Sequence, residues 1–137
     1  MKRIGCVFMV AVLMCVFLSG CGQKKDEASA PLKLVSHIEI LYDYRQSQLR
    51  RLYTDTDKID VVLHYLHKLT PYGLAADDPE YLQGDSCKIT VHLSDGSQHI
   101  YRMRGSRYLS VEFHQWQNVD YNKGSVLFHL FRHLPSD

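Results

Sequence analysis

Apolar and polar residues alternate along Val35–Tyr44, the two-residue period of a strand that is buried on one face. The apolar positions of this period are Ile38, Ile40 and Tyr42. The polar stretch 45–48 then predicts a turn. A second strand is predicted over Leu49–Thr54, although Arg50 and Arg51 interrupt its alternation.

Two segments have the three- and four-residue spacing of amphipathic helices. The first opens at residues 54–57, whose side-chain oxygens can accept from the free N–H groups of a first turn, and it ends at residues 71–73. Its apolar stripe is Ile59, Val62, Leu63, Leu66 and Leu69. The second helix spans about Asn122–His133 and ends at Leu134-Pro135. Its apolar stripe is Val126, Leu127, Leu130, Phe131 and Leu134.

The stretch from Cys87 to His114 predicts a three-stranded antiparallel meander, and Asp95-Gly96 marks its first turn. A two-residue loop would place Leu93 opposite Gln98 and mix apolar with polar positions across the pair. A three-residue loop with Gly96 at positive φ instead pairs residues 91 with 99, 89 with 101 and 87 with 103. We predict this second register because it keeps Tyr101 and Met103 on the apolar face.

A second turn at residues 104–107 leads into a third strand, in which Leu109, Val111 and Phe113 alternate with polar residues. Residues 72–86 contain glycine, proline and aspartate and predict a long surface loop, which is uncommon unless it has a role or folds locally. The order strand, second strand, helix, loop, three strands, helix predicts an α+β domain over residues 32–137. Its small antiparallel sheet is expected to have helices on one face.

The N-terminus has the pattern of an export signal. Lys2 and Arg3 precede an apolar run of 15 residues from Ile4 to Leu18, shorter than the roughly 20 that a membrane-spanning helix needs. Leu18-Ser19-Gly20-Cys21 resembles the lipobox of bacterial lipoproteins, and the whole layout resembles small lipoproteins of Gram-positive bacteria. The resemblance implies that residues 1–20 are a signal peptide and that Cys21 carries the lipid that holds the protein at the extracytoplasmic side of the cell membrane. Residues 21–31 are then the lipidated cysteine and a polar, flexible tether.

Charge and cysteine content limit the possible partners and chemistry. Removal of Lys2 and Arg3 with the signal peptide lowers Lys+Arg from 16 to 14 against 15 Asp+Glu, a net charge of −1. This balance offers no electrostatic argument for nucleic acid. Of four cysteines only Cys21 and Cys87 would remain, so the domain is expected to fold without a disulfide.

The sequence contains no catalytic motif that points to an enzyme, and no cofactor is expected. Metal binding through surface histidines is the alternative hypothesis, since His129 and His133 stand four residues apart on a helix and His64 and His67 three apart. Neither pair has a third ligand at a spacing that the sequence defines, and no dedicated metal site is predicted.

The polar face of the meander is the candidate recognition surface. Its residues are Lys88, His92, Arg102, Arg104, Tyr108, Glu112 and His114. An antiparallel sheet can simply face water on one side, but arginine and aromatic residues are common at the energetic centres of binding interfaces. The expected function is a membrane-anchored binding module, such as an immunity or inhibitor lipoprotein, whose partner is a protein, peptide or envelope glycan. Trp116 is expected to be a lid over the core.

Overall fold

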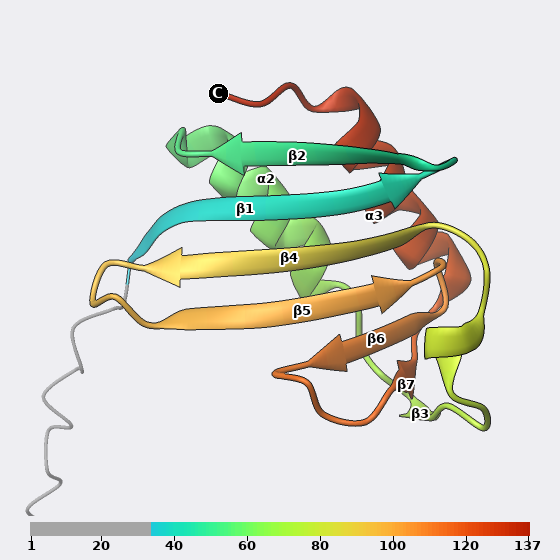
Figure 1. Ribbon diagram of the computed structural model, residues 1–137. Helices are drawn as coiled ribbons and strands as arrows, with labels where there is room; N and C mark the ends of the chain where they lie inside the picture. The colour runs from blue at the N-terminus through green and yellow to red at the C-terminus, as the bar shows by residue number, and fades with distance from the viewer. Residues whose placement is uncertain (1–33) are drawn as a thin grey trace, which may run out of the picture. The chain divides into compact units, whose positions relative to one another are not determined.

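The computed structural model describes residues 34–137 (Figure 1). The strand that begins at Val35, with its alternating apolar residues, lies within a seven-stranded antiparallel sheet. Its elements are β1 (Val35–Tyr44), β2 (Ser47–Tyr53), α2 (Thr56–His67), β3 (Gly73–Leu74), the 3₁₀ turn η1 (Pro79–Tyr81), β4 (Ser86–Leu93), β5 (Gln98–Arg104), β6 (Tyr108–Val111), β7 (Gln117–Asn118) and α3 (Tyr121–His133). The strand order is β2-β1-β4-β5-β6-β7-β3. Both helices cover one face of the sheet (Figure 1), so the predicted α+β fold is confirmed. The signal peptide, the lipobox and the tether lie outside the described residues.

The predicted register of the meander is confirmed. In the β4–β5 pair, Val91 lies opposite His99 and Cys87 opposite Met103. Gly96 has a φ of 84° in the connecting turn, where a residue with a Cβ would be strained. The three-residue loop therefore keeps the apolar set of both strands on the helix-covered face.

The core lies between this face and the two helices. Its fully buried side chains include Ile38, Ile40, Tyr42, Ile89, Met103, Val62, Leu127 and Phe131. Each large apolar side chain stabilises the fold by about 1.5–3 kcal/mol when fully buried. Asp55 caps α2 by accepting from the N–H groups of Asp57 and Lys58, as the predicted start of this helix requires.

The apolar stripe of the last helix was predicted wrongly in part. Gly124, Leu127, Phe128 and Phe131 are buried, whereas Val126 is 46% exposed. These buried positions follow the i, i+3, i+4, i+7 spacing from a glycine, which has no side chain and so does not register in an apolar pattern. Gly124 packs directly on the β5–β6 turn, where an added Cβ would lie 2.1 Å from the carbonyl oxygen of Ser106.

Three other segments differ from the prediction. The second strand begins two residues earlier than expected, because Arg45 and Gln46 alone form a tight hairpin turn with positive φ. Segment 72–86 is not a continuous loop, since it contains β3 and η1. The third strand of the meander ends at Val111, and Phe113 points outward with 58% of its surface exposed.

Candidate functional site

The face of the sheet opposite the helices, here called the open face, is partly covered by two loop segments. Residues 74–80 and 113–116 line a cleft of about 530 Å³, with Arg102 of β5 between them. We call this feature the loop cleft. A second pocket of about 200 Å³ continues over the open face and shares Glu80, Arg102 and Trp116 with it.

The first wall of the loop cleft is held by hydrogen bonds to the backbone of η1. Asp78 begins η1 by accepting from the N–H of Glu80 at 3.0 Å. Arg104 donates to the carbonyl oxygens of Pro79, at 3.2 Å, and Glu80, at 2.7 Å. Pro79 is buried. A segment rich in turn residues is thereby fixed against β5.

Arg102 joins the two walls. Its Nη1 contacts Glu80 Oε1 at 2.8 Å, and its Nη2 donates to Ser110 Oγ at 3.2 Å. Its guanidinium group lies 4.8 Å from the ring centroid of Phe113 and 4.9 Å from that of Trp116. Both contacts are within the range of a cation–π interaction, so one side chain sets the positions of both aromatic rings.

The second wall contains two consecutive non-glycine residues in the left-handed region. The φ angles are 50° at Glu112 and 59° at Phe113, a conformation that is uncommon for any residue with a Cβ and an outlier for a bulky one. Such strain costs of the order of 1 kcal/mol or more per residue, and it persists only where surrounding contacts impose it.

Those contacts come from β5 and β6. The backbone N–H of Glu112 donates to the carbonyl oxygen of Ile100 at 2.8 Å, and the Glu112 side chain accepts from the N–H of Ile100 at 3.2 Å. Ser110 Oγ donates to the carbonyl oxygen of His114 at 2.6 Å. The turn therefore holds Phe113 outward at the edge of the loop cleft.

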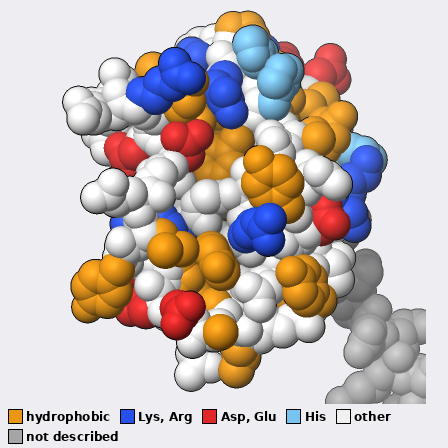
Figure 2. Space-filling model, turned by 90° about the vertical axis from the view of Figure 1, so that its right-hand side faces the viewer, with side chains coloured by type: hydrophobic (Ala, Val, Ile, Leu, Met, Phe, Trp, Pro, Cys, Tyr) orange, Lys and Arg blue, Asp and Glu red, His pale blue; other side chains and the backbone are white. Residues whose placement is uncertain are grey.

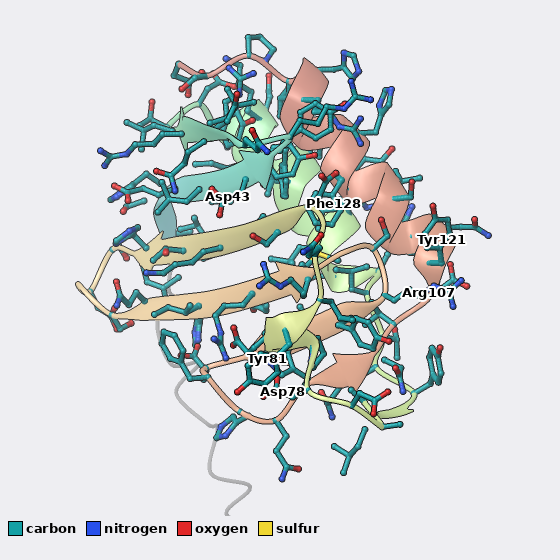
Figure 3. The ribbon with its side chains drawn as sticks, turned by 45° about the vertical axis from the view of Figure 1, so that its right-hand side comes forward. Asp43, Asp78, Tyr81, Arg107, Tyr121 and Phe128 are labelled. Carbon is teal, nitrogen blue, oxygen red and sulfur yellow. The ribbon has the colours of Figure 1, made fainter. Side chains whose placement is uncertain are left out.

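Exposed apolar side chains gather at the same end of the domain. Tyr72, Leu74, Tyr81 and Leu82 are exposed in addition to Phe113. Figure 2 shows hydrophobic side chains beside acidic ones over the lower part of the side that it presents, where β3 and η1 lie. Tyr81 and Asp78 lie together on the η1 segment in Figure 3. Apolar clusters rimmed by polar residues are typical of interaction sites.

The acidic groups of this rim are largely unpaired by cations. Asp77 and Asp78 have no salt bridge to any described residue, and only Glu80 is paired, with Arg102. The loop cleft is therefore an aromatic and aliphatic site with a negatively charged edge.

The structure distributes the residues of the sequence-predicted recognition surface over several environments. Lys88 is exposed and lines the 200 Å³ pocket. Arg102 and Arg104 hold the loop cleft together, as described above. Tyr108 is half-buried on β6, and the exposed His114 lines the cleft. Ser110 of β6 lies on the same polar side of the alternation as Tyr108, but it is fully buried and donates to the carbonyl oxygen of His114.

The remaining two residues of that predicted surface, Glu112 and His92, do not line the loop cleft. Glu112 lies in the left-handed turn, and its carboxylate contacts His99 Nδ1 at 2.9 Å. His92 is half-buried at the far end of β4, where its ring stacks on that of His37. The predicted recognition surface is therefore divided between a cleft at one end and a histidine pair at the other.

The prediction that Trp116 is a lid over the core was wrong. This side chain lies against Arg102 on the open face and lines both pockets, away from the helix-covered core. Sequence reasoning also missed Phe113 and the acidic rim. The unusual length of the 72–86 segment was the signal for the rim, but no glycine or proline marks the turn at residues 112–113.

Cys87 lies on the helix-covered face and is buried. Burial raises the pKa of its thiol far above the usual range, which disfavours the thiolate that a nucleophile requires. This environment favours a packing role for Cys87.

In comparisons with known proteins, no family model, curated protein or solved structure matches this chain. Within residues 34–137, neither helix is long and apolar enough to cross a membrane.

Proposed function

We propose that this protein is a membrane-anchored lipoprotein whose domain binds a segment of another polypeptide in the loop cleft. The partner segment would present an apolar side chain next to a lysine or arginine. The observation that carries the proposal is the strained turn at Glu112 and Phe113, which holds an aromatic side chain outward beside a preformed cleft.

Several properties of the loop cleft support a polypeptide partner. Aromatic residues dominate the energetic centres of protein interfaces, and the cleft has two, held by one arginine. Preorganisation lowers the entropy that binding must overcome. Asp77 and Asp78 provide negative charge that a cationic residue of the partner would complement.

The lipobox supports the location. Lipid on Cys21 would concentrate the domain at the extracytoplasmic surface of the membrane, and two acyl chains are enough for stable anchoring. In cell fractionation, we expect Cys21→Ser to move the protein from the membrane fraction to the soluble fraction. Retention of the serine variant in the membrane fraction would contradict lipid anchoring at this residue.

Trp116 makes the binding proposal directly testable, because it is the single tryptophan of the chain and it lines the cleft. We would titrate the purified protein with two sets of tryptophan-free peptides of equal length and follow Trp116 emission. Both sets carry one leucine or phenylalanine, beside arginine or lysine in the first set and beside glutamate in the second. We expect a saturable change with the basic set only, and weaker binding at high salt.

Phe113→Ala should weaken peptide binding by about tenfold or more, as expected for an interface residue worth at least 1.4 kcal/mol. Val126→Ala is the matched control, because Val126 is exposed on α3, outside the loop cleft. The proposal fails if neither peptide set changes the emission, or if the two sets bind alike and Phe113→Ala binds as well as Val126→Ala.

A further inference from the structure

A second cluster of chemically active side chains lies at the other end of the open face. His37 of β1 is paired with His92 of β4, and their rings are stacked with centroids 4.1 Å apart and planes 11° apart. Glu39 follows two residues after His37 and so projects from the same face of β1. One ligand atom from each of these three side chains lies within 4.8 Å of the others.

The register of the β1–β4 pair places the two histidines opposite each other, and a bulge in β1 lies directly before them. The β1–β4 register shifts between Val35 and His37, so that Val35 lies opposite Leu93 and His37 opposite His92. The pairing of His37 with His92 belongs to the register that continues without a break to Asp43 opposite Ser86. Bulges are common next to functional sites, and this one lies directly beside the two imidazoles.

The hydrogen bonds around the cluster leave ligand atoms available. His92 Nε2 is buried and has no hydrogen-bond partner among the described residues, an expensive state for a polar atom unless something binds it. His37 Nδ1 lies 2.8 Å from Ser36 Oγ. A hydrogen bond to one ring nitrogen is the usual way in which a metal-binding imidazole is oriented toward the ion by the other nitrogen.

Glu39 is engaged only by a weak competitor. Its Oε1 lies 3.4 Å from Arg50 Nη2, and the Arg50 side chain is 70% exposed. Exposed ion pairs of this kind contribute between about 0 and 1 kcal/mol. A divalent cation can therefore displace Arg50 from the carboxylate at little energetic cost.

We propose that His37, Glu39 and His92 bind one divalent transition-metal ion of the zinc type. Two imidazole nitrogens and one carboxylate oxygen are a ligand set that zinc uses, and three protein ligands leave a fourth position for water or an external ligand. Calcium and magnesium are disfavoured because they prefer oxygen ligands. The site is independent of the proposed peptide binding, since it lies where β1 begins and β4 ends, whereas η1 precedes the start of β4 (Figure 1).

The histidine pair that the sequence singled out is the natural comparison. His129 and His133 of α3 are both exposed, with ring centroids 4.2 Å apart. Among the residues that the structure describes, only the cluster of His37, Glu39 and His92 brings three potential metal ligands together. We therefore assign the zinc site to the cluster on the sheet and not to the histidine pair on α3.

Zinc titration of the full-length chain in detergent, against a chromophoric chelator, tests the proposal. We expect one zinc ion per chain, and a loss of affinity of about tenfold or more in His37→Gln and His92→Gln because each removes a direct ligand. His129→Gln should bind as the unaltered protein does. Arg50→Gln should bind zinc at least as tightly, since it removes the competing cation. Far-UV circular dichroism checks folding, and if His92→Gln does not fold, His37→Gln at the start of β1 decides.

Two further measurements separate this site from cysteine ligation, since the chain contains four cysteines. Cobalt should give the visible absorption of a nitrogen- and oxygen-ligated ion without a thiolate charge-transfer band. Zinc should raise the melting temperature of the unaltered protein and of His129→Gln, but not of His37→Gln. Any one of three results would overturn the proposal: unchanged zinc affinity in His37→Gln, loss of zinc affinity in His129→Gln, or a thiolate charge-transfer band with cobalt.

Discussion

Replacement of Arg102 by alanine tests whether the loop cleft is held as the structure indicates. The change removes the ion pair with Glu80, the hydrogen bond to Ser110 and the contacts with Phe113 and Trp116. The ion pair and the two aromatic contacts join β5 to the two walls of the loop cleft. We therefore expect the cleft to loosen while the helix-covered core remains folded.

The expected loss of stability follows from the exposure of each contact. The Arg102–Glu80 pair has side chains 26% and 48% exposed, so we assign it about 0.5 kcal/mol after solvent screening. The hydrogen bond to Ser110 contributes about 1 kcal/mol. Each cation–π contact contributes about 0.5 kcal/mol at a partly exposed position. Together these interactions predict that Arg102→Ala lowers the free energy of unfolding by about 2–3 kcal/mol.

Urea unfolding followed by far-UV circular dichroism measures this loss without using Trp116, whose surroundings the substitution itself changes. Arg50→Ala is the matched control, because Arg50 also lies in a strand of the open face and pairs with a carboxylate but is 70% exposed. We expect that control to cost less than about 0.5 kcal/mol. If Arg102→Ala destabilises the protein no more than Arg50→Ala does, Arg102 is not the residue that holds the cleft.

Three other predictions follow from single contacts. Gly124→Ala should lower the urea midpoint, because the added Cβ would lie 2.1 Å from the backbone oxygen of Ser106. A clash with backbone belongs at the upper end of the roughly 1–3 kcal/mol cost of overpacking, which exceeds the gain of about 1 kcal/mol in helix propensity. An unchanged midpoint would contradict this packing. Asp137→Asn should lower the melting temperature at neutral pH. The hydrogen bond from Lys58 holds the pKa of Asp137 well below its usual range, so this contribution exists above about pH 4 and is lost as acid protonates the folded carboxyl; a difference from the unaltered protein that persists in strong acid would refute it. Cys87 should resist alkylation in the folded protein and react in denaturant, as read by mass spectrometry of its peptide, because burial raises the pKa of its thiol; rapid reaction under native conditions would show that the thiol is accessible.

Local pattern was sufficient for most of the scaffold. The alternation in β1, β4 and β5 follows from the two-residue period of a strand, and the turn at Gly96 follows from a backbone angle that favours glycine. The β4–β5 register then followed from the alternation of faces along each strand, since a slip of one residue would have moved every apolar side chain to the wrong face. These features depend on neighbours within a few residues of one another along the chain, so the sequence alone determined them.

The candidate sites depend on tertiary structure. His37 and His92 meet only because β1 pairs with β4 in a register that places them opposite each other, which the local periodicity of either strand does not reveal. The turn at Glu112 and Phe113 carries no glycine, and its left-handed backbone is imposed by Ile100, Ser110 and Arg102 from other parts of the sheet. Short-range preference predicts an extended strand there, and the combined free energy of these long-range contacts overrides it. The sequence alone therefore determined the strands, the helices and their apolar faces, while the three-dimensional packing decided which polar and aromatic residues came together on the other face.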